Sequence, residues 1–186
     1  SVDAGVYRSL IANRRVVEAS GGLVVISASA MNQLMGSLIR NSGRISASSI
    51  VSNGGQIELV ADTVVNKGTI SANSSAPASV LANGGQVSIV ANTINLRPSS
   101  VISASANNLG NGGVISLSAN NSENISGKIL AHSGILGGQG GVISTVSKNQ
   151  LTIDSGTVVN ASSVTSTLGQ AGTWLIQAAN VLIDSN

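Results

Sequence analysis

Apolar and polar residues alternate over six-residue stretches that recur about every 30 residues. The stretches are LVVISA from Leu23, QIELVA from Gln56, QVSIVA from Gln86, VISLSA from Val114, VISTVS from Val142 and TWLIQA from Thr173. A period of two is typical of a β-strand with one buried face. The register predicts two inward columns, one of Val24, Ile57, Val87, Ile115, Ile143 and Trp174, and one of Ile26, Leu59, Ile89, Leu117, Thr145 and Ile176.

Each alternating stretch follows a pair of small residues and precedes two shorter strand patterns. The second residues of the pairs are Gly22, Gly55, Gly85, Gly113, Gly141 and Gly172. The second patterns are TVVN from Thr63, TINL from Thr93, LTID from Leu151 and NVLID from Asn180. The third are GRISA from Gly43, GTISA from Gly68, SVISA from Ser100, GKILA from Gly127 and GTVVNA from Gly156. Three short strands in a unit of this length predict one turn of a parallel β-helix.

We therefore expect an all-β fold, a parallel β-helix of about five to six turns, occupying residues 1–186 as a single segment of a longer repeat protein. Helical solenoids have a similar period, but Val, Ile, Ser, Thr, Asn and Gly favour strands and turns. A propeller remains an alternative, although its blades predict a period nearer 40 residues. One stretch departs from the pattern: Met31, Leu34, Met35 and Leu38 have helical spacing, which predicts a short helical insertion at residues 29–38.

Composition narrows the function classes. Only 9% of the 186 residues are charged, Phe and Cys are absent, and Trp and Tyr occur once each. Without cysteine the chain has neither disulfides nor thiolate metal sites. The nine Lys and Arg residues form no run longer than two, so nucleic acid is not an expected partner. The longest apolar run is far below the roughly 18 residues of a membrane span.

Candidate chemical groups are few and scattered. His132 follows the third-strand pattern and is expected to point outward, with no acidic residue at metal-ligand spacing. Glu58, Asp62 and Asp154 are not expected to cluster, because the positions equivalent to Glu58 in later units are serines. Trp174 is expected to fill the core. We therefore assign no catalytic, cofactor-binding or metal-binding residue. The loops 73–83 and 105–111 differ in length between matching units, so they are the candidate recognition surfaces.

Several segments together resemble a known family. They are Ser9–Asn13, Val16–Ala28 and Arg40–Ala47, followed by the repeats GGQIELVA from Gly54 and NKGTISA from Asn66, and by GTWLI from Gly172. These residues are similar to the filamentous haemagglutinin and high-molecular-weight adhesins of two-partner secretion in Gram-negative bacteria. The likeness covers most of the chain, but the Asn-Pro-Asn-Gly type of motif of that family's secretion domain is missing.

The resemblance implies a right-handed β-helix and a non-enzymatic rod segment of a large adhesin that supports cell adhesion. It also implies export across the outer membrane through a dedicated two-partner secretion transporter, and a location outside the cell or on its surface. The expected partners are then that transporter and a receptor or glycan on a host or neighbouring cell. Two alternatives stay open: the stalk of a contact-dependent toxin-delivery protein, and a carbohydrate-active β-helix enzyme.

Overall fold

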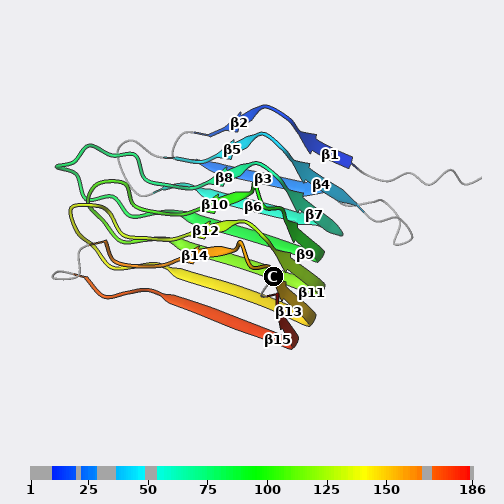
Figure 1. Ribbon diagram of the computed structural model, residues 1–186. Helices are drawn as coiled ribbons and strands as arrows, with labels where there is room; N and C mark the ends of the chain where they lie inside the picture. The colour runs from blue at the N-terminus through cyan, green and yellow to red at the C-terminus, as the bar shows by residue number, and fades with distance from the viewer. Residues whose placement is uncertain (1–9, 20–21, 29–36, 49–53, 165–168, 185–186) are drawn as a thin grey trace, which may run out of the picture.

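The computed structural model is a parallel β-solenoid, in which each turn of chain stacks on the turn before it (Figure 1). It describes residues 10–19, 22–28, 37–48, 54–164 and 169–184. Within these residues every secondary-structure element is a strand, and every pairing between named strands is parallel. No helix long and apolar enough to cross a membrane occurs in the described ranges.

Two sheets form the walls of the solenoid. The smaller sheet has one short strand from each turn, and its members are β2 (Val16–Glu18), β5 (Arg44–Ser46), β8 (Thr69–Ser71), β10 (Val101–Ser103), β12 (Lys128–Leu130) and β14 (Val158–Asn160). The larger sheet begins with five shorter strands, β1 (Leu10–Asn13), β3 (Leu23–Ala28), β4 (Leu38–Asn41), β6 (Gln56–Ala61) and β7 (Thr63–Asn66). It continues with four long strands, β9 (Gln86–Leu96), β11 (Val114–Ile125), β13 (Val142–Ile153) and β15 (Thr173–Ile183).

Each long strand spans two faces of the solenoid, because it bends after its sixth residue. β9 pairs with β6 through its first half and with β7 through its second half. At the bend the register shifts between Ala119 and Ser122, where β11 has one more residue than β9. The bend follows the alanine column at Ala61, Ala91 and Ala119, where small side chains leave room for the backbone to turn.

The inward columns predicted from the alternation are confirmed. Ile57, Val87, Ile115 and Ile143 lie in register on successive turns, and so do Leu59, Ile89, Leu117 and Thr145. All eight are at most 1% exposed. Burial falls off on β15, where Ile176 is 38% and Ile183 is 68% exposed, because these side chains are stacked on one side only. Stacking between turns therefore forms the core, as in other solenoids.

A ladder of asparagines forms one corner of the first turns. Asn13, Asn41 and Asn66 follow one another in register. The Nδ2 group of Asn13 donates to Asn41 Oδ1 at 2.9 Å, and that of Asn41 donates to Asn66 Oδ1 at 2.8 Å. The same Oδ1 atoms of Asn41 and Asn66 accept the backbone N–H of Gly43 and Gly68. On the next turn Leu96 takes the equivalent position, so the buried Nδ2 of Asn66 has no acceptor.

One acidic side chain interrupts an aliphatic column. Glu123 pairs in register with Ile94 on one side and with Leu151 on the other. It is 1% exposed, and neither carboxyl oxygen has a hydrogen-bond partner. Burial raises the pKa of Glu123 from 4.5 to about 8, because a charged carboxylate is strongly disfavoured among aliphatic side chains. At neutral pH the folded chain therefore carries this carboxyl mainly in its protonated form.

The helical insertion expected at residues 29–38 falls mostly outside the described residues, which resume at Ser37. Its last residue, Leu38, does not continue a helix. It is the first residue of β4, which pairs with β1 and β7. The strand pairing between turns overrides the local helical spacing at this position.

Candidate functional site

Each turn is closed by a backbone hydrogen bond between a glycine and an alanine. The N–H groups of Gly55, Gly85, Gly113, Gly141 and Gly172 donate to the carbonyls of Ala47, Ala72, Ala104, Ala131 and Ala161 at 2.6 or 2.7 Å. The alanine directly follows the third strand of one turn, and the glycine directly precedes the first strand of the next. The described residues between them, at 73–84, 105–112 and 132–140, therefore lie outside the closed core, and their number differs from one turn to the next.

Glycine is required at this closure because the backbones approach very closely. A Cβ atom at Gly113 would lie 2.0 Å from the carbonyl oxygen of Gly85 and 2.8 Å from that of Ala104. At Gly85 the nearest atom, the carbonyl oxygen of Gly55, would be at 2.1 Å. The glycine pairs that mark the repeat in the sequence are therefore packing positions at the closure of each turn.

Three loops that lie between a closing alanine and the next closing glycine stack on one another. We call them the side lobe and define it as residues 73–83, 105–111 and 133–139. Its loops extend to one side of the solenoid (Figure 1). The parallel ladder continues through them: Ser74 N–H donates to Ser105 O, Ala106 N–H to His132 O, and Gly110 N–H to Gly137 O, at 3.0 to 3.1 Å. The two loops expected to be recognition surfaces are thus ordered against each other and against a third.

The lobe has a small core of its own and an aliphatic crest. Ala76, Ala82 and Ala106 are at most 3% exposed. The large aliphatic side chains of the crest face solvent instead, with Leu81 66%, Ile135 59% and Leu136 51% exposed. Leu81 and Leu109 lie side by side through a parallel bridge, and Leu109 forms another with Gly137. Exposed aliphatic groups gathered at one edge are typical of an interaction surface.

Two grooves run beside the lobe. One, of about 370 Å³, is lined by five glycines from three turns and by Gln56, Gln86, Asn83 and Asn111. Its asparagines are used within the fold, since Asn83 Oδ1 accepts the N–H of Asn111, and Asn111 Oδ1 accepts that of Gln139, each at 2.8 Å. This groove contains no charged residue.

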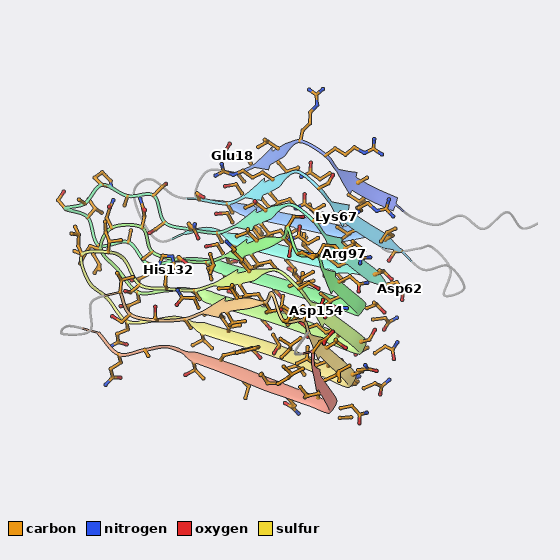
Figure 2. All side chains as sticks on the ribbon, in the orientation of Figure 1. Glu18, Asp62, Lys67, Arg97, His132 and Asp154 are labelled. Atoms are coloured by element: carbon orange, nitrogen blue, oxygen red, sulfur yellow. The ribbon has the colours of Figure 1, made fainter. Side chains whose placement is uncertain are left out.

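The second groove, of about 310 Å³, lies where the smaller sheet meets the lobe. It is lined by Arg44, Ser48, Ser71, Asn73, Ser74, Ser75, Ser105, Ala106, Asn107 and His132. His132, expected to be an outward surface residue, is half-buried on this side of the molecule (Figure 2). Its position in a polar groove could not be derived from the sequence, because the residues around it come from four different turns.

The acidic residues Glu58, Asp62 and Asp154 are held in separate places. Glu58 is on the outer face of β6. Asp62 accepts a hydrogen bond from the Nδ2 of Asn92, and Asp154 accepts one from the hydroxyl of Ser126. Asp62 and Asp154 appear at different corners in Figure 2. Within the described residues no three His, Asp or Glu side chains are grouped so that they could hold a metal ion.

Trp174 lies in the predicted inward column opposite Ile143 on β13, but it is only half-buried. Its indole Nε1–H donates to the hydroxyl of Thr145 at 3.1 Å, and the Thr145 hydroxyl donates to the carbonyl of Leu175. Thr145, which is fully buried, is thereby satisfied within an otherwise aliphatic column. The pair links β13 to β15 and has no free polar atom to offer a ligand.

The class of protein defined by these features is a parallel β-solenoid with a stacked side lobe. Comparison with family models, with curated proteins and with solved structures finds no match.

Proposed function

We propose that this chain is a non-enzymatic rod segment of a large exported adhesin of the filamentous haemagglutinin type, in which the solenoid is the support and the lobe makes contact. The observation that carries the proposal is the separation of the two regions by the glycine–alanine closures. The columns inside the closures are aliphatic at most positions, with Thr145 and Glu123 as exceptions, whereas the described loops outside them differ in length and sequence.

The aliphatic crest supports a role in contact with another macromolecule. Leu81 and Leu136 have no packing role in the core cluster of the solenoid, and each exposes more than half of its surface. Burying such side chains against a partner is favourable by about 25 cal/mol per Å² of apolar surface. A location on the bacterial surface, export through a two-partner secretion transporter and a receptor on another cell belong to the same proposal.

A cell-adhesion assay tests this proposal. The purified chain is coupled to beads, and binding of the beads to cultured epithelial cells is counted for the unchanged chain and for the double variant Leu81→Ser and Leu136→Ser. We expect at least a fivefold loss of bound beads with an unchanged thermal unfolding midpoint, because both side chains are exposed in the free protein.

The matched control is the double variant Val25→Ser and Val90→Ser. These valines are 53% and 39% exposed on the outer face of the larger sheet, and neither lines a groove beside the lobe. The control should bind cells as well as the unchanged chain does. Equal binding by the lobe variant and the control variant, or absence of binding by the unchanged chain, would contradict the proposal.

The stalk of a toxin-delivery protein is the second candidate. It would use the same solenoid as a spacer and would not need the crest, so the crest variant would behave like the control. A carbohydrate-active enzyme would need grouped carboxylates, and Glu58, Asp62 and Asp154 occupy separate positions. Release of reducing ends from polysaccharides by the purified chain would favour the enzyme over the adhesin.

A further inference from the structure

The polar groove beside the lobe crosses four consecutive turns. The four strands beside the groove are in register. Arg44 of β5 pairs with Thr69 of β8, Thr69 pairs with Val101 of β10, and Val101 pairs with Lys128 of β12. Asn73, Asn107 and His132 follow these strands on successive turns. Neighbouring turns are about 4.8 Å apart, so the groove offers polar groups over about 14 Å along the solenoid axis. Such a groove suits an extended ligand better than a small ion.

The residues that line the groove have more hydrogen-bond donors than there are acceptors bonded to them. Asn73 Oδ1 accepts from the hydroxyl of Ser103 at 2.7 Å and from the N–H of Ser105 at 2.8 Å. These bonds fix the amide, and its Nδ2 group donates to no protein acceptor in the described structure. The same is true of the Asn107 amide and the Arg44 guanidinium. No Asp or Glu lines the groove; Glu18 on the adjacent strand β2 pairs in register with Ser46 and lies outside the lining.

His132 adds a defined acceptor at the far end. Its Nδ1 lies 2.8 Å from the carbonyl oxygen of Ser133. A carbonyl only accepts, so Nδ1 carries the proton in the neutral ring and Nε2 has a free lone pair. The backbone N–H of His132 donates to the hydroxyl of Ser105 at 3.2 Å, which holds the residue against the wall of the groove.

The chemistry of the lining excludes two ligand classes. A peptide would need pockets for apolar anchors, and Ala106 is the only apolar residue of the groove. A single-stranded nucleic acid would need aromatic platforms and several cations, and the groove has no Phe, Tyr or Trp and a single arginine. Hydroxyl-rich ligands with a few negative charges fit one guanidinium, two asparagine amides and serine hydroxyls.

We propose that the groove from Arg44 to His132 binds an extended oligosaccharide that carries carboxylate groups. Arg44 holds a sugar carboxylate, the amides of Asn73 and Asn107 donate to hydroxyl and ring oxygens, and His132 Nε2 accepts a sugar hydroxyl. This inference rests on the proposed adhesin function, since it names the class of ligand for the flank of the same lobe. No aromatic ring takes part, so the affinity of a single site is low.

Binding is tested with oligogalacturonate of four to six residues as the probe and neutral oligogalactose of the same length as the comparison. Titration of the ¹⁵N-labelled chain should move the side-chain amide signals of Asn73 and Asn107 with the acidic probe, at a dissociation constant at least fivefold below that of the neutral one. Arg44→Gln should raise the dissociation constant of the acidic probe at least fivefold and leave that of the neutral probe within twofold.

Arg97→Gln is the matched control, because it removes the same charge. Arg97 is exposed at a corner beside Lys67, outside the groove lining (Figure 2). We expect less than a twofold change in this variant. A second pair of variants adds a negative charge: Asn107→Asp should abolish binding of the acidic probe, whereas Asn120→Asp, at an exposed position outside the groove, should have little effect.

The outcomes separate this inference from the proposed function. Equal binding of the acidic and neutral probes, equal losses in the two arginine variants, or no binding at millimolar probe by a folded chain would overturn the groove assignment. If cell adhesion is nevertheless lost in the crest variant, the adhesin proposal stands without the acidic ligand. Probe binding without any cell adhesion would overturn the adhesin function and leave the groove as a binding site.

Discussion

The core of the solenoid and the side lobe use the same parallel hydrogen bonding, yet they place opposite demands on their residues. In the core, Ile57, Val87, Ile115 and Ile143 occupy one position on four turns, and each is almost completely buried. In the lobe, the bridged positions on three turns are Leu81, Leu109 and Gly137, which differ in size and exposure. Main-chain bonds order both regions, but side-chain packing restricts only the first.

The largest effect should follow from damage to the closure that separates the two regions. Gly113→Ala places a methyl group 2.0 Å from the carbonyl oxygen of Gly85, so adjacent turns cannot keep their spacing. We expect loss of the cooperative thermal transition, measured by circular dichroism. Gly156→Ala is the matched control, because a Cβ atom there meets nothing within 4 Å. Similar unfolding midpoints for both variants would show that the closure is dispensable.

Glu123 offers a pH-dependent test of the core. The unfolded carboxyl ionises above pH 4.5, whereas the folded one stays neutral up to about 8. Unfolding therefore becomes easier as the pH rises from 4.5 to 8, and the folded state is most stable with respect to this group below pH 4.5. At 1.36 kcal/mol per pH unit, the free energy of unfolding at pH 7 is lower by on the order of 3 kcal/mol than it is below pH 4.5.

Glu123→Leu should remove this dependence and raise the free energy of unfolding at pH 7, because leucine matches Ile94 and Leu151 in the column. Glu123→Gln should remove the dependence with a smaller gain, since a buried amide still lacks partners. Urea titrations at pH 5, 7 and 8.5 measure both effects. A pH slope that persists in Glu123→Leu would mean that another group causes it.

The smallest effect is expected in the lobe. Residues 77–81 are exposed or half-buried, and within the loop the Val80 N–H bonds to the Pro77 carbonyl. Replacing these five residues with a Gly-Ser sequence of the same length should lower the free energy of unfolding by less than about 1 kcal/mol. Chemical denaturation measures the change. A loss above about 2 kcal/mol would show that the lobe crest supports the core.

The alternation in the sequence was sufficient to predict the main columns, because a strand with one buried face repeats every two residues. It missed the second strand of the fourth turn, Ser122–Ile125, where Glu123 replaces the expected aliphatic residue. The strand forms there because β9 and β13, on either side of it, provide backbone hydrogen-bond partners. Pairing with adjacent turns is a tertiary interaction, so the local sequence pattern around a polar residue does not reveal it.

The asparagine ladder has a recurring signal in the sequence. Asn41 and Asn66 each precede a glycine by two residues and an isoleucine by four, and Asn13 precedes Val17 by four. The candidate grooves had no such signal. Asn73, Asn107 and His132 are brought together by stacking of loops, and that stacking uses backbone groups that every residue carries. Only the variable lengths of the loops were visible in advance.

The perpendicular arrangement of strands and solenoid axis has a mechanical consequence. Tension applied along the axis loads the hydrogen bonds between two turns one after another, so the rod yields by unspooling single turns. The turn from Gly85 to Gly112 contains 28 residues, and its release would lengthen the chain by about 90 Å. A filament built in this way absorbs a sudden pull by unfolding one turn at a time while the remaining turns stay folded.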